Sequence, residues 1–166
     1  MKKRFGILLL LITTWSCTAS VSFTGADVDD NIKTATIEIF ENQAPLTNAN
    51  FPRIITEALR DKFIRQTKLK IINEGGDVNF RGAITMYSTS PVAVSGAETA
   101  SLTRLTIGIS VEYINKLDET KNFNQNFSRY ADFNATQNLN AVEDQLMTEI
   151  SDQLVQDIFN RAFLNW

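Results

Sequence analysis

Two long segments in which apolar and polar residues alternate constrain the fold of this chain more than any other feature. In the first, residues 78–89, the apolar positions on one face are Val78, Phe80, Ile84 and Met86. In the second, residues 102–114, one face carries Leu105, Ile107, Ile109, Val111 and Tyr113, and the other carries Arg104, Thr106, Gly108, Ser110 and Glu112. A period of two residues is typical of a strand with one buried face. The segments therefore predict neighbouring strands of a sheet that is covered on one side only.

Helical patterns elsewhere in the chain predict the elements that cover this face of the sheet. Residues 51–66 and a segment that opens at residues 136–140 carry apolar residues three and four apart, which predicts two amphipathic helices. Alternating segments at 34–40, 69–72 and 123–133 predict further strands. The predicted buried positions outside the two long segments are Ala35, Ile37, Ile39, Ile54, Ile55, Ala58, Leu59, Phe63, Ile64, Phe123, Phe127, Leu139, Val142, Leu146, Ile150, Leu154, Ile158 and Phe159. Two helices on one face of a mixed or antiparallel sheet would bury them all, so the predicted fold is an α+β two-layer sandwich.

The N-terminus has the pattern of a signal peptide. Three basic residues at positions 2–4 precede an apolar run at 5–12, which is far shorter than the ~20 residues that span a bilayer. The only cysteine, Cys17, follows the small residue Ser16, an arrangement that resembles a bacterial lipoprotein signal. Thr14 departs from that pattern, because such signals usually carry Leu three residues before the cysteine. The alternative is an ordinary secreted protein whose cysteine is removed or stays free.

Lipidation at Cys17 would divide the chain into three parts. Residues 1–16 would be a lipoprotein signal peptide, residues 17–30 the lipidated cysteine and a flexible tether, and residues 31–166 a single α+β domain. Acyl chains would hold the protein on a membrane. The first acidic residue after the cysteine is Asp27, and by analogy with surface-export signals this predicts a protein that faces the periplasm.

Composition excludes several classes of function. Removal of residues 1–16 leaves 13 basic and 19 acidic residues, a net charge of −6, which excludes a protein built to coat nucleic acid. The chain has no histidine and no second cysteine, so the commonest metal ligands and the usual general base are absent. Glu143 and Asp144 are adjacent and point in different directions on a helix. We therefore expect no enzyme activity and no cofactor.

Two features remain as candidate contact surfaces. Arg81 and Arg104 are predicted on the polar face of the sheet, with Lys116 and Lys121 on a nearby hairpin. Guanidinium groups suit phosphate, so these four residues are candidates for contact with an anionic glycolipid or a partner; the alternative is an ordinary solvated face. The apolar C-terminal end, residues 159–166, would either dock on its own sheet or contact a partner.

Several short motifs together resemble one known family. They are the stretch 22–25 after Cys17, the stretch 48–63 with its TEALRDKF sequence, and the segments 75–77, 102–107, 127–130 and 142–144. The chain resembles the LptE family, and within it the branch from Bacteroidota. The resemblance implies two helices on one face of a four-stranded sheet. It also implies an outer-membrane lipoprotein subunit of the lipopolysaccharide transport and assembly translocon, on the periplasmic side.

The resemblance further implies that the protein is the plug and assembly aid of a large β-barrel of the LptD type and contacts lipopolysaccharide. The four basic candidates above come from charge and placement in this sequence, not from the family. A different function is compatible with the same anchor and fold. It is a lipid-anchored periplasmic adaptor or ligand-binding protein, similar to a pilotin, that serves another envelope complex.

Overall fold

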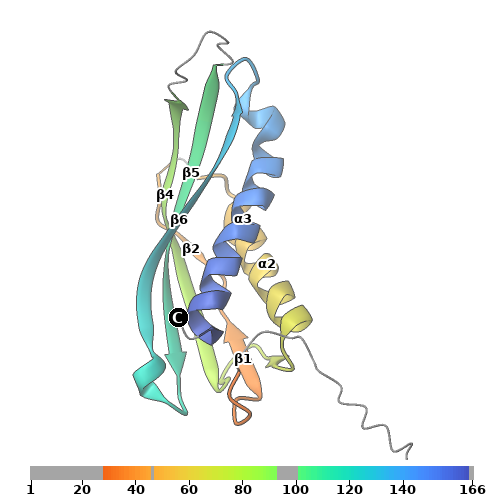
Figure 1. Cartoon of the computed structure of the whole chain (residues 1–166), viewed down its shortest axis with the longest axis vertical. Helices are drawn as coiled ribbons and strands as arrows, with labels where there is room; N and C mark the ends of the chain where they lie inside the picture. Colours follow the sequence, from red (N-terminus) through yellow and green to blue (C-terminus); the bar gives the residue numbers. More distant parts are fainter. Residues whose placement is uncertain (1–27, 46, 93–100, 165–166) are drawn as a thin grey trace, which may run out of the picture.

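The computed structural model describes residues 28–45, 47–92 and 101–164 (Figure 1). Its elements are β1 (Thr34–Ile37), β2 (Glu41–Asn42), α2 (Phe51–Gln66), β3 (Lys70–Ile71), β4 (Val78–Val92), β5 (Leu102–Asn115), the 3-10 turn η2 (Glu119–Lys121), β6 (Phe123–Asn134) and α3 (Leu139–Phe163). Predicted signal peptide, Cys17 and most of the predicted tether lie outside the described residues.

The described strands form one mixed sheet in the order β3-β1-β4-β5-β6, with β2 beside β4. The pairs β4–β5 and β5–β6 are antiparallel, and β1 and β2 run parallel to β4. Both helices lie on the same face of this sheet, so the predicted two-layer α+β sandwich is confirmed (Figure 1). The sheet has six strands rather than the four that the family resemblance implies. Strand β3 lies in the predicted segment 69–72, whereas the two-residue strand β2 was not predicted because it is too short to show a period.

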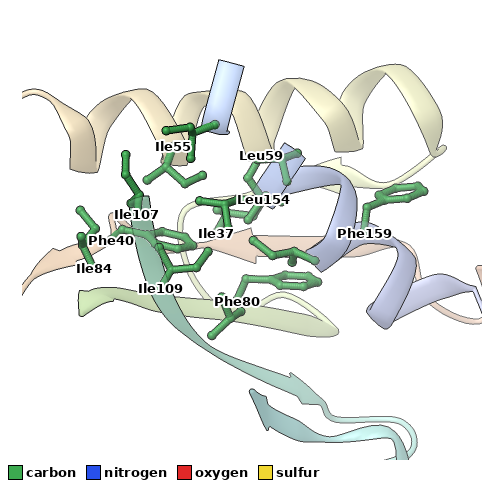
Figure 2. Packing of buried hydrophobic residues seen from close by; sticks show 14 of the residues in the cluster. Ile37, Phe40, Ile55, Leu59, Phe80, Ile84, Ile107, Ile109, Leu154 and Phe159 are labelled. Atoms are coloured by element: carbon green, nitrogen blue, oxygen red, sulfur yellow. The ribbon is translucent and has the colours of Figure 1, made fainter. Parts of the chain in front are cut away.

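An aromatic cluster lies at one end of the core between the helices and the sheet. The ring of Phe63 from α2 lies 4.9 Å from that of Phe80, 5.6 Å from Phe159 and 5.4 Å from Phe163, measured between centroids. Figure 2 shows Phe80 and Phe159 pointing into the layer between sheet and helices. Because Phe163 is buried here, it docks on its own sheet, as one of the two alternatives predicted. Trp166 lies outside the described residues.

Three apolar residues predicted in the core are exposed. A register shift between Ile84 and Met86 reverses the alternation of β4, so that Met86 is 40% exposed and Tyr87 packs against the core instead. Ile39 is 68% exposed because β1 ends at Ile37 and Phe40 fills the core position. Ile64 is 60% exposed at the edge of the apolar stripe of α2. The placement of Ile39, Ile64 and Met86 in the core was therefore wrong.

A turn before β4 fastens β1 to the sheet. Gly75 has φ +80°, and a Cβ at Gly76 would lie 2.7 Å from the backbone N of Thr36, so both positions favour glycine. Asp77 then reaches β1, where its Oδ2 accepts hydrogen bonds from the backbone N of Lys33 at 2.9 Å and of Thr34 at 2.8 Å. The Thr34 hydroxyl donates a third bond at 2.8 Å.

These bonds predict a pH dependence of stability. The backbone bond from Lys33, and then those from Thr34, lower the pKa of Asp77 below the usual carboxyl value. The resulting stabilisation is complete above the carboxyl pKa of the unfolded chain and is lost as the pH falls through the lower pKa of the folded state. Asp77→Asn should therefore reduce stability at neutral pH and flatten its loss in acid. Thermal unfolding between pH 7 and pH 2 measures this, with the exposed Asp152→Asn as a control. Parallel pH curves for Asp77→Asn and the unmodified protein would contradict the prediction.

Candidate functional site

The face of the sheet opposite the helices is the candidate site. Among the described residues no helix or loop covers it along β4, β5 and β6 (Figure 1). Strand register arranges its outward side chains in five rows: Arg81–Glu112–Asn124, Ala83–Ser110–Asn126, Met86–Gly108–Ser128, Ser88–Thr106–Tyr130 and Ser90–Arg104–Asp132. We call these fifteen residues the outer face.

One end of the outer face is held by an ion-pair network. Arg81 contacts the carboxylate of Glu38 at 3.1 Å and that of Glu112 at 3.4 Å. The hydrogen bond from Arg81, and a second one from Asn79, lower the pKa of Glu38. The positive charge of Arg81 is therefore balanced by two carboxylates within the protein.

A second ion pair lies at the other end of the outer face. Arg104 donates two parallel hydrogen bonds to Asp132, at 2.7 and 2.8 Å. Its guanidinium also stacks on the ring of Tyr130, 3.6 Å from the centroid. The hydrogen bond from Arg104 lowers the pKa of Asp132. Planar, bidentate pairing of this kind fixes both side chains.

The four basic candidates do not form one cluster. Arg81 and Arg104 share a face, as predicted, but eight residues of β5 separate Glu112 from Arg104, or roughly 26 Å at about 3.3 Å per residue. Lys116 and Lys121 lie on the hairpin at the Arg81 end and are both exposed. The ammonium of Lys121 is 3.8 Å from Asp118. The two arginines therefore belong to separate ion pairs, and the lysines are the more accessible cations.

The three middle rows of the outer face carry no charge. Their side chains are mainly hydroxyls and amides from Ser88, Ser110, Thr106, Asn126 and Ser128. Met86 lies across Gly108, where a Cβ would come within 3.1 Å of the methionine Cβ. This part of the outer face is neutral and carries hydrogen-bonding groups. The sequence placed Thr106, Gly108, Ser110 and Glu112 on the polar face as well, but it predicted only the arginines of this face as contact candidates. The polar even-numbered positions between Phe123 and Phe133 indicated the β6 contribution.

A hydrogen-bonded network missed by sequence reasoning joins three elements on the helix side. The Tyr87 hydroxyl donates to Glu143 Oε1 at 2.5 Å, and Asn48 Nδ2 donates to Glu143 Oε2 at 2.7 Å. The alternation predicted for residues 78–89, with Val78, Phe80, Ile84 and Met86 on the buried face, implies that Tyr87 faces away from the core. That placement was wrong, because the register shift in β4 turns Tyr87 toward the helices. Burial, and then the bond to Glu143, raise the pKa of Tyr87 well above its ordinary value. The network links β4, the entry to α2 and α3.

Loss of this network should cost measurable stability. Glu143→Ala leaves the half-buried Tyr87 hydroxyl and Asn48 amide without their acceptor, so we expect a loss of about 1–3 kcal/mol in the free energy of unfolding. The neighbour Asp144 is exposed, and Asp144→Ala should change stability by less than about 0.5 kcal/mol. Urea denaturation of both variants measures the difference, and equal losses would show that the network contributes nothing.

Within the described residues, no group of three or more His, Cys, Asp or Glu side chains is placed to hold a metal ion. None of the helices in that part of the chain is long and apolar enough to cross a membrane. The candidate lipid-attachment residue Cys17 lies outside the described residues.

The model of one protein family, described as lipopolysaccharide-assembly, matches residues 32–162. The chain belongs to the LptE family. This match confirms the resemblance to the LptE family, and the Bacteroidota branch within it stays a prediction. It identifies the chain as a member of a non-enzymatic family of lipopolysaccharide-assembly lipoproteins of the cell envelope. No curated protein matches the chain in sequence.

Among the solved structures that match, those with TM-scores above 0.5 share the fold at low sequence identity. A hypothetical protein from Chlamydia trachomatis superposes with a TM-score of 0.54 at 9% identity, and the match covers 81% of this chain and 99% of that one. A protein from Xanthomonas campestris gives a TM-score of 0.53 at 9% identity, over 82% of this chain and 91% of that one. A minor lipoprotein from Acinetobacter baumannii gives 0.46 at 11% identity, over 79% and 92%.

Proposed function

We propose that this LptE-family chain is the outer-membrane lipoprotein subunit of a lipopolysaccharide transport and assembly translocon. It acts as the plug and assembly aid of an LptD-type β-barrel and contacts lipopolysaccharide. Acyl chains on Cys17 anchor it to the membrane on the periplasmic side. The polar character of both broad surfaces of the sandwich is the observation that carries this proposal.

The outer face supports a plug because the interior of a membrane barrel is polar and hydrated. Neutral hydroxyls and amides occupy its middle, and its arginines are balanced by carboxylates. The opposite surface is polar as well, since α2 exposes the i,i+4 pairs Arg53–Glu57 and Arg65–Asp61. A plug surrounded by a barrel wall needs two such surfaces, whereas a protein that docks on one side needs only one surface suited to its partner.

Contact with lipopolysaccharide is proposed at Lys116 and Lys121 first, and at Arg81 and Arg104 second. A phosphate group could approach the two exposed ammonium groups directly, but it would have to displace Glu38, Glu112 or Asp132 from the arginines. Charge reversal of both lysines should therefore weaken retention of lipopolysaccharide by the purified protein. Charge reversal of Lys70, which is exposed on the short strand β3, is the matched control. Equal retention by all variants would remove the lysines from the proposal.

Native co-purification tests the proposed function. A C-terminal tag and mild detergent extraction should recover a large outer-membrane barrel of the lipopolysaccharide-export type in stoichiometric amount, identified by mass spectrometry. The same experiment with Cys17→Ala measures how far lipidation is needed for recovery of the barrel. Recovery of a different stoichiometric partner would contradict the plug proposal and favour the pilotin-like adaptor instead.

A further inference from the structure

The long outer strand β6 has a free backbone edge. It is the last strand of the sheet and pairs only with β5, through twelve consecutive residue pairs from Leu102–Asn134 to Tyr113–Phe123 without a register shift. At twelve residues, about 40 Å, it is a long edge to leave unpaired. No other described strand pairs with its outer side.

The register shows which backbone groups point outward. Ala135 N donates to Ser101 O at 2.8 Å, which continues the β5–β6 ladder by one pair. Antiparallel pairs alternate between bonded and non-bonded, so the odd-numbered residues of β6 bond to β5. The bond from Lys116 N to Asp77 O agrees, since it assigns the even-numbered residues of β5 to β4. The N–H and C=O groups of residues 124, 126, 128, 130 and 132 therefore point to the free edge.

At the β6 edge the sheet lacks the features that usually prevent an edge strand from pairing with another strand. The opposite edge has such features. Natural sheets block edges with short strands, bulges, lysine or proline. On the β4 side the border consists of two-residue strands β2 and β3, and the rest of β4 has a register shift and Pro91. Strand β6 has no proline, no lysine and no register shift. Its two charges, Arg129 and Asp132, are held in ion pairs within the protein.

A shallow groove follows this edge on the helix side. Gln125, Phe127 and Arg129 of β6 line it with Asp157, Asn160 and Arg161 of α3. Half-buried Phe127 offers one apolar position. Arg129 pairs with Asp157, and Arg161 donates a hydrogen bond to Gln125, so the groove holds two guanidinium groups and one carboxylate. An added strand would place alternate side chains over this groove. An apolar residue above Phe127 with an acidic neighbour two positions away would complement it.

We infer that β6 is a strand-addition site, whose occupant is an extended segment of the barrel partner. This inference rests on the proposed function, which supplies the barrel. The segment comes from a loop or terminus of the barrel subunit, because the wall strands of a closed barrel have no unpaired backbone groups. Main-chain hydrogen bonds would provide affinity, and the groove would select the side chains.

Hydrogen exchange of the individual β6 amides tests this. In the isolated protein the amides of residues 124, 126, 128, 130 and 132 should exchange fast, and the odd-numbered amides slowly. In the purified complex with the barrel, the even-numbered amides should slow by about ten-fold or more, as expected for added backbone bonds. Unchanged exchange of these amides in an intact complex would overturn the inference and leave the proposed function standing. Absence of any complex with the barrel would contradict both.

Hydrogen exchange of the isolated protein distinguishes the other possible occupants of the β6 edge. Slow exchange of the even-numbered amides that depends on protein concentration would mean that a second copy of this chain occupies the edge. Slow exchange that is independent of concentration would mean that a segment of the same chain occupies it. Either result would overturn the inference.

A proline substitution provides the matched variant. Ser128→Pro removes an outward N–H without removing a β5–β6 bond, which an edge strand tolerates. It should weaken the complex with the barrel by about ten-fold or more, since one bond is lost and the added strand is pushed away. Ser128→Ala keeps the N–H and removes only the side-chain hydroxyl, so it should weaken the complex much less than Ser128→Pro does. Equal weakening by both variants would assign the effect to the side chain and contradict strand addition. Circular dichroism and thermal unfolding check that each variant folds.

Discussion

Phe63→Ala should lower the free energy of unfolding by about 3–5 kcal/mol, the largest loss that we expect from a single substitution. The Phe63 side chain is fully buried, and its ring makes edge-to-face contacts with Phe80, Phe159 and Phe163. Removal of the ring would leave a cavity where α2, α3 and β4 meet, and three rings would lose a neighbour. Backbone constraints on three separate elements prevent the site from collapsing to fill it.

Urea denaturation measures this loss as a shift of the unfolding midpoint. The adjacent residue provides the control, because Ile64 is on the same helix and 60% exposed. Ile64→Ala should change the free energy of unfolding by no more than about 0.5 kcal/mol. Similar losses for the two variants would show that the aromatic cluster is not the centre of the core.

Gly82→Ala should destabilise the protein by about 3 kcal/mol, because it adds a methyl group to a space that is already filled. Gly82 lies on the buried face of β4, and the ring of Phe40 lies directly over it, so that a Cβ at position 82 would overlap the ring. Phe40 cannot move away freely, because it is buried and its backbone N donates to Thr56 Oγ1 at 3.1 Å. One added methyl group therefore forces a backbone shift between β4 and the loop that carries Phe40.

A second substitution tests that explanation. Phe40→Leu makes the side chain over Gly82 smaller, so it should recover part of the stability lost in Gly82→Ala. A double-mutant cycle by urea denaturation gives the coupling energy, which should favour the double variant by about 1 kcal/mol or more. Additive losses would mean that the contact between Phe40 and position 82 is not the cause.

The long periodic segments were predictable because a single physical requirement, the burial of one face, determined the pattern of each segment. Helix α2 was predicted at its observed bounds, since its apolar stripe and Pro52 agree on where it begins. The register shift after Ile84 was not predictable, because it inserts one residue without a glycine or proline to mark it. It moved Met86 out of the core and Tyr87 into it. Strand β2 was missed because two residues show no period.

The sequence could predict on which face of the sheet the candidate residues lie. It could not predict which carboxylates balance their charges. Alternation in β5 placed Arg104 on the polar side, and the pairing of β4 with β5 placed Arg81 there too. Sequence alone could not show that Glu38 and Asp132 lie beside them, because Glu38 follows β1 and Asp132 lies on β6, both distant in sequence from the arginines. The free edge of β6 was also hidden, since which strand ends a sheet depends on long-range pairing.

Site-specific photo-crosslinking from both surfaces of the sandwich tests the plug proposal most directly. A benzophenone side chain would replace Ser110 at the centre of the outer face in one variant, and the exposed Glu57 on α2 in another. Because a plug is surrounded by the barrel wall, both positions should crosslink to the barrel in intact cells. Crosslinks to the barrel from only one of the two surfaces, or from neither, would contradict it.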